Sequence, residues 1–250
     1  MRLVRFQVHG RTACGVLHGE QVTELDGDFF GTLKNSGTGH ALAGVRLLSP
    51  CIPSKVVAVG LNYRDHAREL GLPLPDTPII FLKPPTAVIG PGDIIRFPEM
   101  SSRVDYEAEL GIVIKDRIKD IRPEEARRHI LGYTCTNDVT ARDLQKKDGQ
   151  WTRAKSFDTF CPVGPWIETD LEPDDLLVES FLNGVRRQSS RTSQFIFKTD
   201  HIVSFISRVM TLYPGDLVIT GTPAGIGAME PGDEIEVRIE GIGSLKNLVK

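Results

Sequence analysis

Three carboxylate side chains in the middle of the chain are spaced as ligands of one divalent cation. Glu107 and Glu109 stand two residues apart in the run Val104–Ile114, and Asp138 follows about thirty residues later. Alternate residues of a strand share a face, so Asp105, Glu107 and Glu109 lie opposite the apolar residues of this run. Like charges at such positions repel one another, and a divalent cation relieves the repulsion better than one lysine does. The spacing therefore predicts a metal site.

The ligand atoms of this predicted site are all oxygens, because no cysteine or histidine stands beside them at ligand-like spacing. Carboxylate oxygens favour a hard cation, so we expect Mg²⁺ or Mn²⁺ rather than Zn²⁺. Three carboxylates leave coordination positions open for water and a chelating substrate. The alternative from spacing alone is an amphipathic edge strand on which Glu107 and Glu109 face solvent.

A histidine and a glutamate form a candidate pair for acid–base chemistry. The buried strand predicted at 56–60 leads into a short helix, which Asn62 is expected to cap. His66 and Glu69 lie three residues apart on that helix, so the carboxylate can orient and polarise the imidazole as a general base. The alternative is a solvated helix face. The proline-rich loop 71–78 that follows is a candidate hinge or rim of a lid.

Several cations and an amide follow the predicted metal site and suit an anionic substrate. Arg142 can bind a carboxylate with both branches of its guanidinium group, Lys155 can act as a point charge, and Gln145 adds an amide. The alternative, a solvated basic loop, fits Lys146 and Lys147 better than it fits Lys155, which lies among aromatic residues.

A glycine-rich loop at 220–227 follows a predicted strand near the C-terminus. It contains neither the Gly-Lys-Ser/Thr end of a P-loop nor Gly-x-Gly-x-x-Gly, so we exclude a nucleotide. We expect exposed backbone N–H groups of this loop, such as that of Gly221, and the Thr222 hydroxyl to hold a substrate carboxylate.

The 250-residue chain has the composition of an ordinary globular protein, with 40% hydrophobic and 25% charged residues. Its net charge of −3 and its lack of a basic run argue against nucleic-acid binding. No signal peptide or apolar span of about twenty residues is recognisable, so we expect a cytoplasmic protein without membrane association. The four scattered cysteines form no Cys-x-x-Cys motif and are expected to be reduced thiols.

The first fifty residues are expected to form a small β-rich N-terminal unit. Short runs separated by His-Gly turns predict strands at Arg2–Val8, Thr12–Leu17 and Gln21–Leu25. The segment Leu48–Ser54 holds two prolines and is the expected linker. We therefore divide the chain into an N-terminal unit at 1–50 and a catalytic domain at 54–250.

Strands also dominate the predicted catalytic domain. Three Pro-Gly-Asp turns, each before an apolar run, predict the start of a strand. These turns begin at Pro91, Pro214 and Pro231. Helices are few and are predicted at Pro123–Leu131 and His201–Thr211. A strand at 132–138 is expected to return from the first helix and bring Asp138 beside the two glutamates. The predicted fold class is mixed α/β and strand-dominated, closed or rolled, with a few outer helices.

From about Lys55 to the end, these motifs in this order resemble the fumarylacetoacetate hydrolase superfamily. The resemblance rests on Gly60-Leu61-Asn62-Tyr63 with His66 and Glu69, Asp105-Tyr106-Glu107-Ala108-Glu109-Leu110, Asn137 through Gln145, Trp151 through Asp158, and Thr220-Gly221-Thr222-Pro223. It implies that family's mixed β-sandwich roll, usually as a homodimer. It also implies Mg²⁺ or Mn²⁺ at Glu107, Glu109 and Asp138, a mobile lid with His66 and Glu69, and substrate contacts from Arg142, Gln145, Lys155 and Thr222.

The resemblance further implies a small-molecule substrate, a 2-oxo or dicarbonyl acid, that reacts through an enolate stabilised by the metal and Lys155. We expect metal-dependent hydrolysis of a carbon–carbon bond in an acylpyruvate or fumarylacetoacetate-like acid, with His66, oriented by Glu69, deprotonating the attacking water. The alternative is an isomerase (tautomerase) or decarboxylase of 2-hydroxyhepta-2,4-diene-1,7-dioate, from aromatic-acid breakdown, or of a related diacid such as oxaloacetate. A second alternative is a non-catalytic metal-binding protein.

Overall fold

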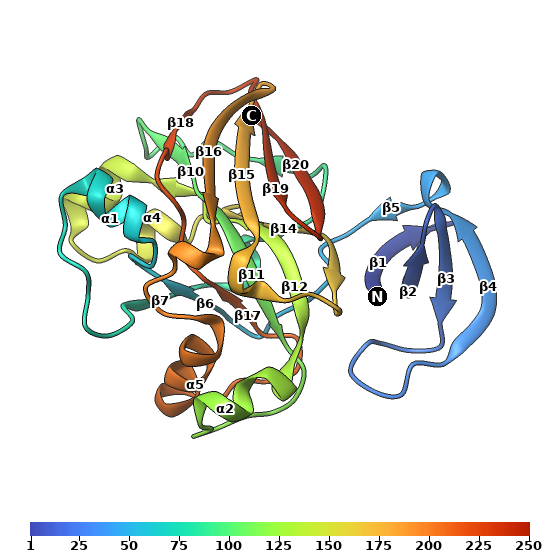
Figure 1. Ribbon diagram of the computed structural model, residues 1–250. Helices are drawn as coiled ribbons and strands as arrows, with labels where there is room; N and C mark the ends of the chain where they lie inside the picture. The colour runs from blue at the N-terminus through green and yellow to red at the C-terminus, as the bar shows by residue number, and fades with distance from the viewer.

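The computed structural model describes all 250 residues, and strands make up most of its regular structure (Figure 1). They form a 12-stranded sheet, a five-stranded sheet and a three-stranded sheet, with few helices. The predicted strand-dominated fold class is confirmed. No helix is both long enough and apolar enough to cross a membrane.

The N-terminal residues form a run of antiparallel strands that stands to one side of the rest of the molecule (Figure 1). The strands are β1 (Arg2–Val8), β2 (Arg11–His18), β3 (Gln21–Leu25), β4 (Asn35–Ala41) and β5 (Arg46–Leu47). The three predicted strands are confirmed. Strand β4 was not predicted, because its polar, glycine-containing sequence is largely exposed and shows no apolar alternation. That residues 1–50 form a separate domain, and that the protein is a homodimer, stay predictions.

The large sheet runs through the whole molecule in the order β4-β3-β2-β1-β14-β12-β11-β17-β6-β7, with β5 paired to β1 and β8 to β14. Its strands beyond residue 50 are β6 (Val56–Val59), β7 (Ile80–Lys83), β8 (Val88–Ile89), β11 (Ala108–Ile114), β12 (Ile130–Asn137), β14 (Cys161–Glu168) and β17 (Leu217–Ile219). Strand β11 is buried along its whole length and pairs with β12 on one side and β17 on the other.

The five-stranded sheet packs against the large sheet and closes the main core. Its order is β16 (Val185–Arg191), β15 (Leu177–Leu182), β19 (Glu234–Ile239), β20 (Gly243–Val249) and β9 (Ile94–Ile95). Leu110 and Ile112 of β11 belong to one buried cluster with Val178 of β15 and Val237 of β19. This apolar burial supplies the main driving force that fixes the two sheets together.

The acidic run that sequence periodicity predicts as one strand is divided between two sheets. Residues Val104–Tyr106 form β10, which lies in the three-stranded sheet between β13 (Thr140–Ala141) and β18 (Gly227–Met229). The run re-enters the large sheet as β11, so Glu107 stands at the break between the two strands. The expectation of one continuous strand was therefore wrong at this residue, because a period of two cannot show where a strand changes sheets.

The Pro-Gly-Asp turns behave as predicted. Their glycines, Gly92, Gly215 and Gly232, have φ values of 75°, 84° and 102°. Residues that carry a side chain rarely adopt this backbone conformation. Each turn is followed by a strand, namely β9, β17 or β19.

The helices are α1 (Arg64–Leu70), α2 (Pro123–Ala126), α3 (Arg142–Asp148), α4 (Thr152–Lys155) and α5 (Thr199–Val209). The helix predicted at 123–131 is shorter, because β12 already begins at Ile130. Helices α3 and α4 occupy the segment for which a solvated basic loop was the alternative interpretation. Gly149, left-handed at φ 69°, ends α3, whose last turn holds two lysines, a stop signal that the sequence analysis did not use.

Candidate active site

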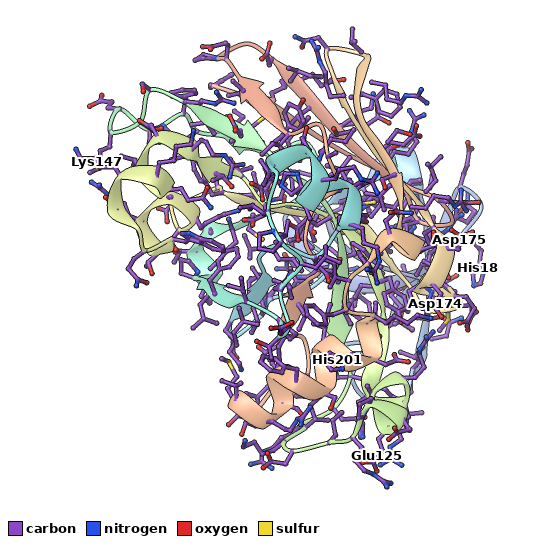
Figure 2. All side chains as sticks on the ribbon, turned by 60° about the vertical axis from the view of Figure 1, so that its left-hand side comes forward. His18, Glu125, Lys147, Asp174, Asp175 and His201 are labelled. Atoms are coloured by element: carbon purple, nitrogen blue, oxygen red, sulfur yellow. The ribbon has the colours of Figure 1, made fainter.

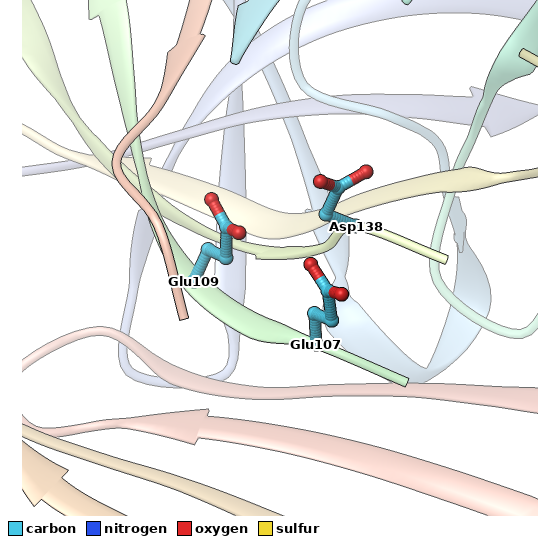
Figure 3. A group of neighbouring side chains, drawn as sticks. All are labelled: Glu107, Glu109 and Asp138. Carbon is cyan, nitrogen blue, oxygen red and sulfur yellow. The ribbon is translucent and has the colours of Figure 1, made fainter. Parts of the chain in front are cut away.

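The three predicted metal-ligating carboxylates converge in the interior (Figure 3). One oxygen from each of Glu107, Glu109 and Asp138 lies within 4.8 Å of the others, and all three residues are buried. Glu107 comes from the break before β11, Glu109 from β11 itself, and Asp138 from the end of β12. The alternative of two solvent-facing glutamates is therefore wrong.

Hydrogen bonds donated by backbone N–H groups hold these elements in register. The N–H of Glu107 donates to Asn137 Oδ1 at 2.9 Å, and the N–H of Asp138 donates to the Glu107 carbonyl at 2.9 Å. Asn137 also pairs with Ala108 across the β11–β12 ladder. The end of β12 is thus fastened to the break before β11, which places Asp138 beside Glu107.

Two cations compensate the charge of Glu107. Lys155 Nζ donates to Glu107 Oε2 at 2.8 Å, and the Arg142 guanidinium contacts the other oxygen. Burial alone raises the pKa of Glu107, but the charges of Lys155 and Arg142 outweigh burial and lower it to about 2. Asp138 is flanked in the same way, by Lys155 Nζ and Lys83 Nζ, each at 2.5 Å.

Glu109 has no such partner. The only hydrogen bond to its carboxylate comes from the N–H of Gly221, at 2.7 Å to Oε2. Burial, together with the negative charges of Asp138 and Glu107, raises its pKa well above the usual range. A buried carboxylate beside two others, with all ligand atoms oxygen, fits a hard divalent cation, which would favour the ionised form of Glu109.

The predicted acid–base pair is formed on α1 and faces the same cavity. His66 Nδ1 lies 2.8 Å from Glu69 Oε2, and His66 lines the cavity above the carboxylates. The other Glu69 oxygen accepts the N–H of Gly225 at 3.0 Å, and Asp65 of the same helix contacts the Ser190 hydroxyl. These contacts tie α1 to the loop after β17 and to β16. Movement of α1 as a lid stays a prediction.

Asn62 does not cap α1, so that expectation was wrong. The cap position is Tyr63, and the Asn62 side chain instead joins two distant segments. Its Nδ2 donates to the carbonyls of Thr220, at 2.7 Å, and Phe197, at 3.2 Å, while its Oδ1 accepts the Phe197 N–H at 2.8 Å. Asn62 thereby holds the strand end that carries Gly221 against the entry to α1.

Replacing Asn62 by alanine is expected to lower the free energy of unfolding by about 3 kcal/mol, because buried backbone groups lose their partners. Urea unfolding of the purified protein measures this change. Asn35→Ala, on exposed β4, is the matched control and is expected to cost less than about 1 kcal/mol. Equal effects of the two substitutions would contradict the bridging role.

A cavity of about 310 Å³ lies over the carboxylates. Among the predicted substrate-binding residues, Arg142, Gln145, Lys155 and Thr222 line it, together with His66. One wall is apolar and includes Leu61, Phe81 and Trp151, with the last two rings in edge contact at a centroid distance of 5.1 Å. The volume and the mixture of apolar wall and polar floor are typical of a small-molecule site.

The loop at 220–227 uses its polar groups differently from the sequence expectation. The Gly221 N–H donates to Glu109, and Gly221 does not line the cavity. The Thr222 hydroxyl donates to the Ala108 carbonyl at 3.0 Å and accepts from Gln188 at 2.8 Å. The loop therefore orients a carboxylate of the cluster, while substrate contact by Gly221 or Thr222 stays a prediction.

Lys83 is a site residue that the sequence analysis missed. It is fully buried at the end of β7 and contacts both Asp138 and the Val139 carbonyl. The available signal was a lysine ending the apolar run Ile79–Leu82, since a buried lysine requires a carboxylate partner.

Two family models match the chain. Residues 55–250 match the one described as fumarylacetoacetate (FAA) hydrolase, C-terminal, and residues 1–50 match the one described as Rv2993c-like, N-terminal. The second match covers residues in which the sequence analysis recognised no family motif.

Three similar proteins extend these matches. The crystal structure of a 2-hydroxyhepta-2,4-diene-1,7-dioate isomerase from Mycobacterium marinum is 49% identical, with a TM-score of 0.94 over 100% of this chain and 98% of that one. A fumarylacetoacetate hydrolase from Exiguobacterium antarcticum is 39% identical, with a TM-score of 0.91 over 100% and 99%. A mitochondrial oxaloacetate tautomerase of Bos taurus is 43% identical over 218 residues, which are 82% of this chain and 69% of the relative.

Proposed function

The chain belongs to the fumarylacetoacetate hydrolase family, and on that premise we propose that it is a metal-dependent isomerase that interconverts the enol and keto forms of 2-oxo dicarboxylic acids. This proposal replaces the carbon–carbon bond hydrolysis expected from the sequence. Its support from the comparisons is the order of identity, which is 49% and 43% for the isomerase and the tautomerase but 39% for the hydrolase.

The observation that carries the proposal is one cavity lined by His66, the buried Lys155, and Glu107 and Asp138 of the three-carboxylate cluster. Glu107, Glu109 and Asp138 would hold Mg²⁺ or Mn²⁺. When bound, the cation supplies positive charge that polarises a carbonyl group and stabilises negative charge on oxygen. Ketonisation moves one proton from the enol hydroxyl to a carbon atom, which requires a proton carrier and charge stabilisation but no attacking water.

The protein's own residues divide these tasks. Lys155, buried and ionised between Glu107 and Asp138, stabilises negative charge on the substrate oxygen while the hydroxyl proton is absent. His66 accepts the proton that leaves the enol hydroxyl and delivers it to the carbon, and Glu69 keeps its ring oriented by accepting from Nδ1. The apolar wall of Leu61, Phe81 and Trp151 can pack against the hydrocarbon part of the substrate.

The purified protein is expected to accelerate loss of the enol absorbance of 2-hydroxyhepta-2,4-diene-1,7-dioate and of enol-oxaloacetate in the presence of Mg²⁺, and EDTA is expected to abolish the effect. Acetylpyruvate is the comparison substrate, and its cleavage is followed by the pyruvate that it releases. Cleavage of acetylpyruvate faster than isomerisation of the two enols would contradict the proposal and support a hydrolase. Pyruvate formed from oxaloacetate as fast as the enol disappears would instead identify a decarboxylase.

A further inference from the structure

We propose that Lys146 binds a second carboxylate at the far end of the substrate, so that the enzyme selects dicarboxylic over monocarboxylic 2-oxo acids. This inference rests on the proposed function and identifies the residue that recognises the second carboxylate of the substrate. Lys146 was interpreted from the sequence as part of a solvated basic loop, together with Lys147. The structure places it on α3 instead.

Lys146 lies where two cavities meet. It lines the cavity over the carboxylates and also an adjoining one of about 400 Å³. The two cavities share five lining residues, which are His66, Leu70, Arg142, Gln145 and Lys146. The two cavities therefore adjoin between α1 and α3, so the far end of a long substrate bound in the first cavity would lie close to the second.

Among the cations that line these two cavities, Lys146 alone has no carboxylate within 4.0 Å. Arg103 is paired with Asp105, Arg142 with Asp105 and Glu107, and Lys155 with Glu107 and Asp138. The paired cations compensate protein carboxylates. Lys146 is therefore the cation whose charge is available to pair with a carboxylate of the ligand. An ammonium group beside an anion at a partly enclosed site gives a charge-assisted hydrogen bond.

The first cavity also offers apolar surface beside its charged groups. Leu61, Phe81 and Trp151 line it, and Leu70 lies among polar residues at the junction with the second cavity. Apolar surface close to two charged regions suits a molecule with a 2-oxo or enol carboxylate at one end, an unsaturated hydrocarbon body, and a second carboxylate at the other end.

The test compares Lys146→Met with Lys147→Met. Lys147 is the next residue of α3 and is exposed, as Lys146 is, but it lines neither cavity and lies at the outer edge of the molecule (Figure 2). Both substitutions remove one positive charge at neighbouring positions, so any general electrostatic attraction falls about equally. The substrates are 2-hydroxyhepta-2,4-diene-1,7-dioate and 2-hydroxyhepta-2,4-dienoate, which has a methyl group in place of the far carboxylate.

Lys146→Met is expected to raise KM for the dioate about tenfold with little change in kcat, and to leave KM for the monoacid unchanged. Lys147→Met is expected to change neither KM by more than about twofold, and Lys146→Arg to retain most of the dioate preference. Equal effects of both Met variants, or equal effects on both substrates, would overturn the inference.

A binding measurement separates this inference from the proposed function. If the wild-type protein isomerises neither compound, the proposed function fails. Calorimetric Kd values of the two compounds for the Mg²⁺-loaded wild-type and variant proteins then decide the role of Lys146. A loss of affinity confined to Lys146→Met and the dioate supports it, and identical affinities refute it.

Discussion

Replacing Glu109 by glutamine is expected to lower metal-dependent turnover by about a thousandfold or more while leaving the metal-free protein at least as stable as the wild type. The two effects have one cause. Glu109 is buried beside Asp138 and Glu107, which raises its pKa well above the usual range, so the folded protein disfavours its ionised form. Glutamine removes that cost and keeps an oxygen that can accept the Gly221 N–H.

The sign of the stability change depends on pH. A carboxyl whose pKa is raised by folding opposes folding increasingly as the pH rises above its ordinary value of 4.5. The stability gained by Glu109→Gln in the metal-free protein should therefore appear above that pH and vanish below it. Thermal unfolding in EDTA at several pH values measures this difference. We expect added Mn²⁺ to raise the Tm of the wild type but not that of the variant.

Asp138→Asn is the informative partner of Glu109→Gln, because its effect on the metal-free protein has the opposite sign. Asp138 lies between Lys83 and Lys155, and both are buried. Removing its charge leaves these two lysines undercompensated, at an expected cost of about 3 kcal/mol. If Glu109→Gln retained the Mn²⁺-dependent rise in Tm, the three carboxylates would not be the metal site.

Replacing His66 by glutamine is expected to reduce kcat for enol–keto conversion by roughly 10²- to 10⁴-fold, the range of acid–base catalysis. The imidazole is the group in the cavity that is suited to exchange a proton near neutral pH, and glutamine preserves polarity but not that exchange. The Mn²⁺-dependent rise in Tm should remain, since His66 is not part of the carboxylate cluster. Stopped-flow absorbance of the enol measures the rate.

Glu69→Gln separates orientation from proton exchange at the same pair. The single amide oxygen of glutamine can still accept either the Gly225 N–H or the imidazole N–H, so one of the two hydrogen bonds of Glu69 survives. We expect a smaller loss of kcat than for His66→Gln. An unchanged rate in His66→Gln would exclude the imidazole as the proton carrier and leave that role to a water molecule.

The carboxylate cluster was predictable because its cause is local. Glu107 and Glu109 are separated by one residue, and like charges at that spacing require compensation when they are buried on one strand face. The break at Glu107 was not predictable, because it depends on which strands pair with β10 and which with β11. Pairing partners come from distant parts of the chain, such as β17 and β18, and leave no mark in the run itself.

The surroundings of the cluster were predicted less well for the same reason. Asn62 has the residue type and position of a helix cap, yet its partners are Phe197 and Thr220, more than a hundred residues away. In the sequence, Lys83 is only a lysine at the end of an apolar run. Its role becomes visible once the fold places β7 beside Asp138. Lys146 and Lys147 are alike in sequence, and only the position of α3 distinguishes them.

The double-sided pairing of β11 has a consequence for how the molecule opens. Most amide hydrogens of β11 are bonded to β12 or β17 and are buried, so we expect them to exchange with deuterium only when the large sheet separates, whereas α1 would detach by breaking a few side-chain contacts. We therefore expect the two halves of the site to belong to different cooperative units. The half that holds the carboxylates would then stay assembled while the histidine half opens, and cation uptake and substrate entry would be separable events.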